Sequence, residues 1–263
     1  MMALLALSPA AGAREAVDRR VLGALRPIDA STGVQIAAPL VVSAPGVRFA
    51  RNRSGRYVLL AAPGLAAHTT AFASPPPSPA NGSVTIEVTV ADPAGRFLAR
   101  RVTVRLPRDP SLAAAAQPDS LFALVDVAMY PAPAARTAAG WAVIRATVAG
   151  TSGGSPPRPL AGALIRVVRA SDAARLAAGL SDMRGEALVA VPGIPITTWD
   201  AGPGPVLASE TDVTLETIFD PAAPVIPDPD DLEARRATLP SSVVPARLAA
   251  GRELVTPLVV TLP

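Results

Sequence analysis

The sequence contains neither cysteine nor lysine. Without cysteine the chain can form no disulfide, thiolate nucleophile or cysteine-ligated zinc site, so its stability must come from packing. Its 24 basic residues are all arginines, which we attribute to the codon bias of a GC-rich bacterial genome. Aromatic residues make up only 3% of the chain and do not lie among the arginines, whereas nucleic-acid binding favours basic clusters interleaved with aromatics. We therefore expect no nucleic-acid partner.

Long apolar runs and cofactor motifs are also missing. No apolar stretch reaches the roughly 18 residues that a membrane-spanning helix needs. The sequence has neither Gly-x-Gly-x-x-Gly nor a Walker motif, so we expect no cofactor. His68 is the one histidine, and a catalytic triad would require a carboxylate to hold it and a serine in a strained turn to face it. Because Gly-x-Ser-x-Gly is absent, the sequence favours a non-catalytic His68, the alternative being an esterase-like enzyme.

Structure-breaking residues are abundant, with 30 prolines and 19 glycines spread over 263 positions. Proline removes a backbone donor and glycine weakens helices, so apolar runs interrupted about every ten residues favour many short strands. We predict an all-β protein with two Ig-like or prealbumin-like antiparallel β-sandwich domains and at most one or two short helices. Val84, Ile86, Val88 and Val90 alternate with polar residues, as expected of a strand with one buried face.

A segment rich in proline and alanine separates the predicted domains. Residues 1–16 form an N-terminal extension that weakly resembles a signal peptide. We expect it to be retained because no basic residue precedes its apolar run, the alternative being cleavage near Arg14. Residues 17–108 form a basic Ig-like sandwich, 109–118 the linker and 119–263 the second sandwich. One helix is predicted at 230–239, since acids open it and Pro240 follows it.

The most informative stretch runs from Pro159 to Pro192. It combines Pro159-Leu-Ala-Gly-Ala-Leu-Ile165 with a later Ser181-Asp-Met-Arg-Gly185 turn. An acid that accepts backbone amide hydrogens, followed by a glycine with positive φ, suits a tight corner between strands, so we assign Asp182 and Gly185 a structural role. This pattern resembles the carboxypeptidase regulatory-like, transthyretin-type domain. The resemblance implies a β-sandwich that, in metallocarboxypeptidases, accompanies a separate zinc catalytic domain, which this sequence does not contain.

Charge is distributed unevenly along the chain. Between Arg14 and Asp109 there are 13 arginines and 6 acids, a net charge of +7, whereas the remainder carries a net charge of −4. Copies of such a subunit could associate through these opposite charges or through strand edges, the alternative being that the domains merely differ in surface charge. Arg48, Arg51, Arg53 and Arg56 lie within nine residues and are candidates for binding an acidic protein surface, unless they form a solvated turn.

A cluster of acids precedes and begins the predicted helix. Asp228, Asp230, Asp231 and Glu233 lie within six positions. Hard cations such as Ca²⁺ need about six to eight oxygen ligands from a loop that wraps the ion, and Pro229 stiffens this segment instead. We expect these acids to cap the helix, and we keep Asp228, Asp230 and Asp231 as a weak candidate cation site. No other metal site is expected.

Segments in the first half carry a second resemblance. Asn52–Tyr57, Asp92–Leu98 and Arg105–Pro110 resemble parts of uncharacterised proteins that accompany phage-tail-like contractile injection particles. The resemblance implies a non-catalytic structural or adaptor subunit, such as a baseplate, cap or surface-decorating component. Its partners would be other protein subunits, with assembly in the cytoplasm before any release. The alternative is a secreted, periplasmic or cell-surface β-sandwich module that binds protein or glycan.

Overall fold

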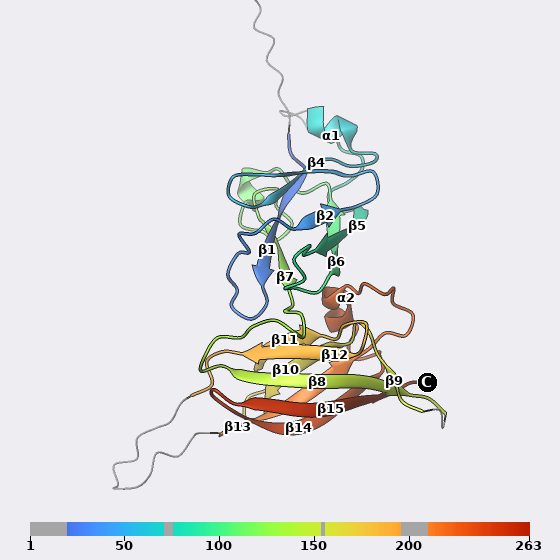
Figure 1. Ribbon diagram of the computed structural model, residues 1–263. Coiled ribbons are helices and arrows are strands. Elements are labelled where there is room, and N and C mark those ends of the chain that lie inside the picture. Colours follow the sequence, from blue (N-terminus) through green and yellow to red (C-terminus); the bar gives the residue numbers. More distant parts are fainter. Residues whose placement is uncertain (1–19, 71–75, 154–155, 196–209) are drawn as a thin grey trace, which may run out of the picture.

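The computed structural model describes residues 20–70, 76–153, 156–195 and 210–263. They form two stacks of β-sheets with two short α-helices, one stack above the other in Figure 1. The predicted all-β class with at most two short helices is thereby confirmed. The predicted extension 1–16 lies outside the described residues. Within the described ranges, no helix is long and apolar enough to cross a membrane.

Two sheets face each other in the first sandwich, with strand orders β3-β4-β1-β7 and β2-β5-β6. An apolar core that includes Leu25, Leu59, Val88 and Val104 fills the space between them. The elements are β1 (Gly23–Asp29), β2 (Val41–Ser43), β3 (Arg48–Arg51), β4 (Tyr57–Ala61), α1 (Ala66–Thr70), β5 (Val84–Ala91), β6 (Arg100–Leu106), the 3₁₀ helix η1 (Leu112–Ala114) and β7 (Val125–Met129).

The predicted alternation in β5 is confirmed. Val88 and Val90 are buried and Val84 and Ile86 partly so, whereas Thr85 and Glu87 are exposed. β5 and β6 form an antiparallel hairpin, as the turn sequence Asp92-Pro-Ala-Gly95 between them predicts. Alternate side chains of a strand point to opposite faces, so this strand presents its valines and isoleucine to the core.

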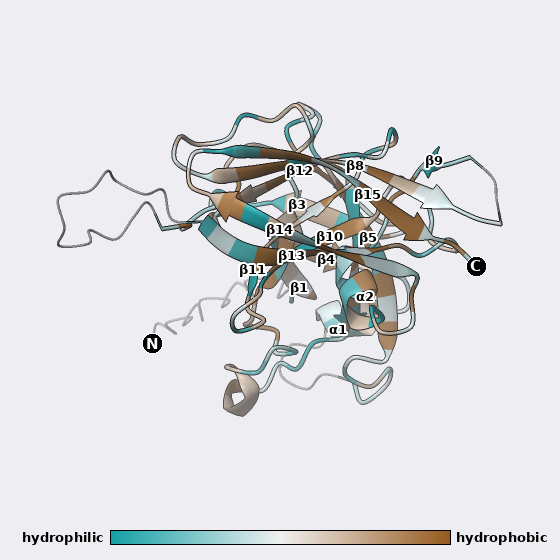
Figure 2. Cartoon of the chain, turned by 90° about the horizontal axis from the view of Figure 1, so that it is seen from below, coloured by the Kyte–Doolittle hydropathy of each residue, from teal (hydrophilic) through white to brown (hydrophobic). Residues whose placement is uncertain are grey.

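The second sandwich also has two layers, which Figure 2 shows with β12, β8 and β15 in one layer and β11, β10, β13 and β14 in the other. Ile144, Ile165, Val189 and Leu258 belong to its buried core. The elements are β8 (Ala142–Thr151), β9 (Arg158–Pro159), β10 (Leu164–Arg169), β11 (Arg175–Leu180), β12 (Glu186–Val191), β13 (Glu210–Ile218), α2 (Pro229–Ala234), β14 (Ser241–Ala249) and β15 (Glu253–Thr261).

The strand β7 lies in the first stack of sheets. It pairs with β1 in parallel, with Leu25 opposite Val125 and Asp29 opposite Met129. The apolar run at 124–130 predicts a strand, and the predicted boundaries assign it to the second sandwich, after the linker at 109–118. β7 instead belongs to the same sheet as β1, and the chain passes to the second stack only after β7. The division of the chain into two independent domains remains a prediction.

Strand direction and several strands differ from the prediction. β8 and β15 pair in parallel, like β1 and β7, although antiparallel sheets were predicted. β3 lies where the sequence indicated a turn, and β11 and β14 were not predicted as strands. An apolar pattern shows which residues are buried but carries no information on the direction of the neighbouring strand.

Candidate functional site

The two sandwiches meet around the side chain of Arg100, the first residue of β6. This side chain is fully buried, with an exposed fraction of 0%. Its Nε donates to Arg101 O at 2.9 Å and its Nη1 to Ala128 O at 3.0 Å. Nη2 donates to Asp228 Oδ1 at 3.3 Å and to Asp230 Oδ2 at 2.5 Å, at the start of α2. Because a buried guanidinium requires counter-charge and acceptors, these carboxylates tie the second sandwich to the first.

The segment before α2 adds further hydrogen bonds to β6. The Arg101 amide donates to Pro227 O at 2.8 Å, and its Nε donates to Ile226 O at 3.0 Å. Thr103 Oγ1 donates to Asp228 Oδ2 at 2.8 Å. Residues 226–228 thus cover β6 on the side away from β5, so its edge is not available there to another strand.

An apolar patch completes this junction. Leu164, Ile218 and Leu232 of the second sandwich form a buried cluster with Tyr130, and Leu98 packs against it. Burial raises the pKa of the Tyr130 hydroxyl. Figure 1 shows α2 between the two stacks. Ion pairs, main-chain hydrogen bonds and apolar contacts therefore join the sandwiches into one packed unit.

The acids of the predicted helix are engaged by arginines and backbone amides. Asp228 is the N-cap of α2 and accepts from the Asp230 amide at 3.1 Å. Asp231 pairs with Arg235, whose Nη2 also donates to Asp220 at 2.6 Å and lowers the pKa of Asp220. α2 ends at Ala234, earlier than the predicted 239. Within the part of the chain that the structure describes, no group of three His, Asp or Glu side chains is placed to hold a metal ion.

The four clustered arginines lie on the hairpin of β3 and β4. Arg48 and Arg51 belong to β3, Arg53 lies in the turn and Arg56 immediately precedes β4. The first three are exposed and Arg56 is partly exposed. No Asp or Glu of the described ranges lies within ion-pair distance of any of the four. The hairpin therefore presents positive charge that the described residues do not neutralise.

The turn of this hairpin is held by several hydrogen bonds. Asn52 Oδ1 accepts from the Arg56 amide at 2.9 Å, and Arg51 Nη2 donates to Ala37 O at 2.5 Å. Gln35 Nε2 donates to Ser54 O. Gly55 adopts a φ of 77°, a conformation that favours glycine. The arginines thus stand on an ordered support, which lowers the conformational cost of binding.

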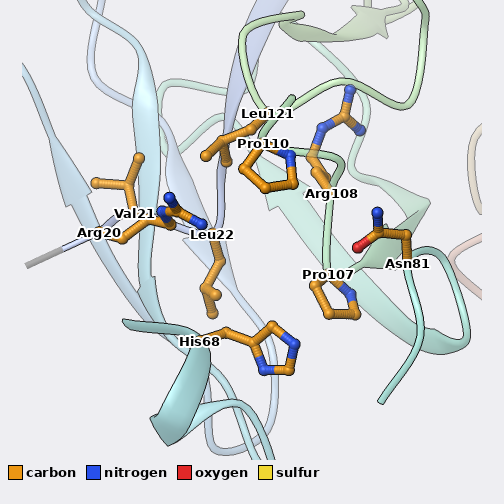
Figure 3. Close-up of a pocket in the computed structure, with 9 residues that line it drawn as sticks. All are labelled: Arg20, Val21, Leu22, His68, Asn81, Pro107, Arg108, Pro110 and Leu121. Atoms are coloured by element: carbon orange, nitrogen blue, oxygen red, sulfur yellow. The ribbon is translucent and has the colours of Figure 1, made fainter. Parts of the chain in front are cut away.

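His68 lies in α1 and is 4% exposed. Neither ring nitrogen has a hydrogen-bond partner among the described residues. Figure 3 shows the imidazole turned toward Pro107, beside a cavity of about 10 Å³ that also borders Leu22 and Leu121. This volume suits one water molecule. No serine and no acid lines this cavity in the described chain, so the geometry does not assemble a triad around His68.

The Ser181–Gly185 corner lies between β11 and β12. Asp182 Oδ1 accepts from the amides of Arg184 at 2.8 Å and Glu186 at 2.9 Å. Gly185 has a φ of 76°, and a Cβ at this position would lie 2.4 Å from Val148 O. Both residues therefore serve backbone geometry, since the acid satisfies amides and only glycine fits against the neighbouring strand.

No family model matches the sequence, and neither does any curated protein. Among solved structures, GBS52, the minor pilin of the Gram-positive pathogen Streptococcus agalactiae, aligns over 81% of this chain and 67% of its own, with 9% identity and a TM-score of 0.27. The Bacillus anthracis TIE protein aligns over 92% of this chain and 34% of its own, with 11% identity and a TM-score of 0.27. This chain thus spans about a third of the TIE protein.

The residue at the centre of the domain junction was not singled out from the sequence. Arg100 lies in a strand whose neighbours at 101 and 105 are also arginines, and only the structure separates the buried one from the others. Its position in the strand was a usable signal. Arg100 lies on the same face of the strand as Val102 and Val104, which face the core, so the alternation predicts that its side chain points inward.

Proposed function

We propose that this chain is a non-catalytic structural subunit of a larger protein assembly. The observation that carries the proposal is the buried cluster of Arg100, Asp228 and Asp230, which joins two sandwiches into one unit. A junction built from a desolvated charge and its counter-charges resists bending between the sandwiches more than a flexible linker would. Such a unit can hold two binding surfaces at a fixed separation, which is what a structural or adaptor subunit requires.

The arrangement around His68 supports the absence of catalysis in this proposal. Among the described residues, the imidazole makes no hydrogen bond to a serine hydroxyl or a carboxylate, and neither group lines the cavity beside it. Acyl transfer requires a nucleophile, a base and an orienting acid within hydrogen-bond reach of one another. A loss of hydrolytic activity in a His68→Ala variant would contradict this part of the proposal.

The finer proposal is a baseplate, cap or surface-decorating subunit of a phage-tail-like contractile injection particle, assembled in the cytoplasm. The resemblance of the segments at 52–57, 92–98 and 105–110 supports it. The second sandwich would be a carboxypeptidase regulatory-like module that serves packing. The corner geometry of Asp182 and Gly185 supports that assignment, because it is the feature on which the resemblance rests.

A second candidate is a secreted or cell-surface module that binds protein or glycan. One observation favours it, a groove of about 490 Å³ beside the domain junction. Its lining combines Leu98 and Val255 with the charged side chains of Arg145, Asp182, Arg184 and Glu186. A concave apolar surface with a few polar groups is the usual setting for a small ligand.

Purification of intact particles from the native organism distinguishes the two candidates. We expect peptides of this chain in constant ratio to sheath, tube and baseplate proteins across the density-gradient fractions. Cell fractionation combined with protease treatment of intact cells tests the second candidate, because a surface module would be accessible to the protease. A chain that is absent from such particles and is removed from intact cells by protease would overturn the particle assignment in favour of the surface module.

A further inference from the structure

We propose that the free edge of β3 binds an acidic, extended segment of a partner protein by β-strand addition. This inference rests on the proposed function and names the chemistry of one partner contact. Two features of β3 carry it: backbone groups that face away from the sheet, and a set of arginines without ion-pair partners in the described chain.

The backbone register determines which groups of β3 are free. The Asn52 amide donates to Arg56 O at 2.9 Å, and Ala50 lies opposite Val58. In an antiparallel pair, hydrogen-bonded and non-hydrogen-bonded residues alternate, so Ala50 and Asn52 direct their backbone groups to β4. Phe49 and Arg51 therefore direct their N–H and C=O groups to the outer edge. No described strand pairs with this edge of β3.

Two edge strands of the second sandwich, β14 and β15, differ from β3 because each has a proline at its centre. In β15, Arg252 O accepts from the Val143 amide at 3.0 Å and the Leu262 amide donates to Thr151 O at 2.7 Å. Even-numbered residues thus face β8, and Pro257 faces the free edge, where it has no N–H to offer. The same reasoning from Phe219 N–H, which donates to Pro240 O at 3.0 Å, places Pro245 at the free edge of β14.

Neighbouring groups also occupy part of the edges at the domain junction. Residues 226–228 cover β6, and Arg100 Nη1 occupies the outward carbonyl of Ala128 on β7. β3 has neither a proline nor such a cover within the described ranges. An added strand would find main-chain partners at Phe49 and Arg51.

Charge indicates the chemistry of that strand. Arg48, Arg51 and Arg53 are exposed and have no ion-pair partner among the described residues. By contrast, Arg26, Arg96 and Arg101 of the same sandwich each form an ion pair. Guanidinium groups match carboxylates in geometry and charge, so an extended segment with alternating acidic residues would satisfy both the edge and its arginines.

The experiment measures fluorescence anisotropy of a labelled peptide of alternating Glu and Thr, titrated with the intact chain at low salt. We expect saturable binding that falls about tenfold or more in the Arg48→Glu/Arg53→Glu variant. The matched control, Arg105→Glu, reverses an exposed arginine on β6 and should bind like the unmodified chain. Thermal melts verify that all variants are folded. We expect them to fold because the substituted side chains are exposed.

Three results with peptides would overturn the proposal. They are no binding of the acidic peptide, equal binding by the charge-reversed variant, and equal binding of a peptide N-methylated at alternate residues. The last would exclude strand addition, since N-methylation keeps the charge and removes main-chain donors. Tighter binding of duplex DNA than of the peptide would assign the arginines to a phosphate polymer instead. If the chain is found in particles but the peptide does not bind, only the β3 proposal fails.

Discussion

Arg100 and Asp230 are separated by 130 positions in the sequence, yet Nη2 of the arginine lies 2.5 Å from Oδ2 of the aspartate. The arginine is fully buried, whereas the side chain of Asp230 is 61% exposed and that of Asp228 13% exposed. The free-energy cost of desolvation therefore arises mainly from the arginine. The two carboxylates, which are less buried, compensate its charge. This asymmetry decides what each substitution at the junction should do.

Removal of both carboxylates in an Asp228→Asn/Asp230→Asn variant should lower the free energy of unfolding by roughly 3 kcal/mol, because it leaves a buried guanidinium without counter-charge. Urea denaturation monitored by circular dichroism measures this change. The matched control is Asp126→Asn, which breaks the exposed ion pair with Arg26 and should cost less than about 1 kcal/mol. Equal losses in the two variants would show that the junction does not depend on this cluster.

Gly185→Ala should destabilise the second sandwich more than Gly193→Ala. Both glycines have positive φ, 76° and 77°, so each substitution carries a backbone cost of about 1–2 kcal/mol. Only at Gly185 would the new Cβ meet a backbone atom, Val148 O at 2.4 Å, whereas nothing lies within 4 Å at Gly193. Thermal denaturation of the two variants isolates the steric part. Identical melting temperatures would argue against close packing of the corner on β8.

Replacing the edge prolines should make the chain self-associate. Pro245→Thr/Pro257→Thr places an N–H at the centre of the free edges of β14 and β15, and an uninterrupted edge can pair with another copy. Analytical ultracentrifugation should show dimers or larger species in this variant. The control, Pro118→Thr, changes an exposed proline outside any strand and should leave the oligomeric state unchanged. An unchanged sedimentation coefficient in both would mean that other features protect these edges.

Acid should destabilise the first sandwich partly through Asp92. Its carboxylate accepts from Arg96 Nε at 2.8 Å and from the Ala94 amide at 3.0 Å, and hydrogen bonding to Arg96 lowers the pKa of Asp92. The folded-state pKa is thus below the unfolded value of about 3.9, so this stabilisation is present above about pH 4 and is lost as the pH falls through the folded value.

The Asp92→Asn variant tests this assignment. It should melt at a lower temperature than the unmodified chain at neutral pH, and the difference should shrink as the pH falls below about 4, because protonation then removes the same charge from Asp92. Differential scanning calorimetry across this range measures both melting temperatures. A difference that is constant with pH would indicate that the carboxylate charge contributes nothing.

The sequence predicted the buried faces of the strands well because burial follows directly from apolar alternation. β4, β5 and β12 begin and end where the pattern of Tyr57–Ala61, Val84–Ala91 and Glu186–Val191 places them. β3 was missed because its arginines and the following Asn52-Arg-Ser-Gly55 satisfy the chemistry of a turn. β14 was missed because Pro245 lies inside it, and proline is compatible with a strand only at a free edge, which the sequence does not reveal.

The junction could not be predicted from the sequence for a different reason. Of the acids at 228–231, Asp228 caps α2 as expected, since it accepts from the Asp230 amide. Asp228 and Asp230 also bind Arg100, which comes from the other sandwich, and no local pattern encodes a contact over that sequence distance. Arg100 lies on the same face of β6 as Val102 and Val104, which predicts that its side chain points inward. The positions of its counter-charges follow only from how the two sandwiches pack.

The most direct test of the central claim is the size of the species that contains this chain in gently lysed native cells. For this experiment a tag is added after Pro263, which is exposed. The tagged chain is then detected by immunoblot across the fractions of a glycerol gradient. A subunit of a large assembly should sediment mainly in fractions far heavier than its own 26.7 kDa, together with other proteins at constant ratio. Recovery of nearly all of the chain at the position of a free monomer would contradict the account.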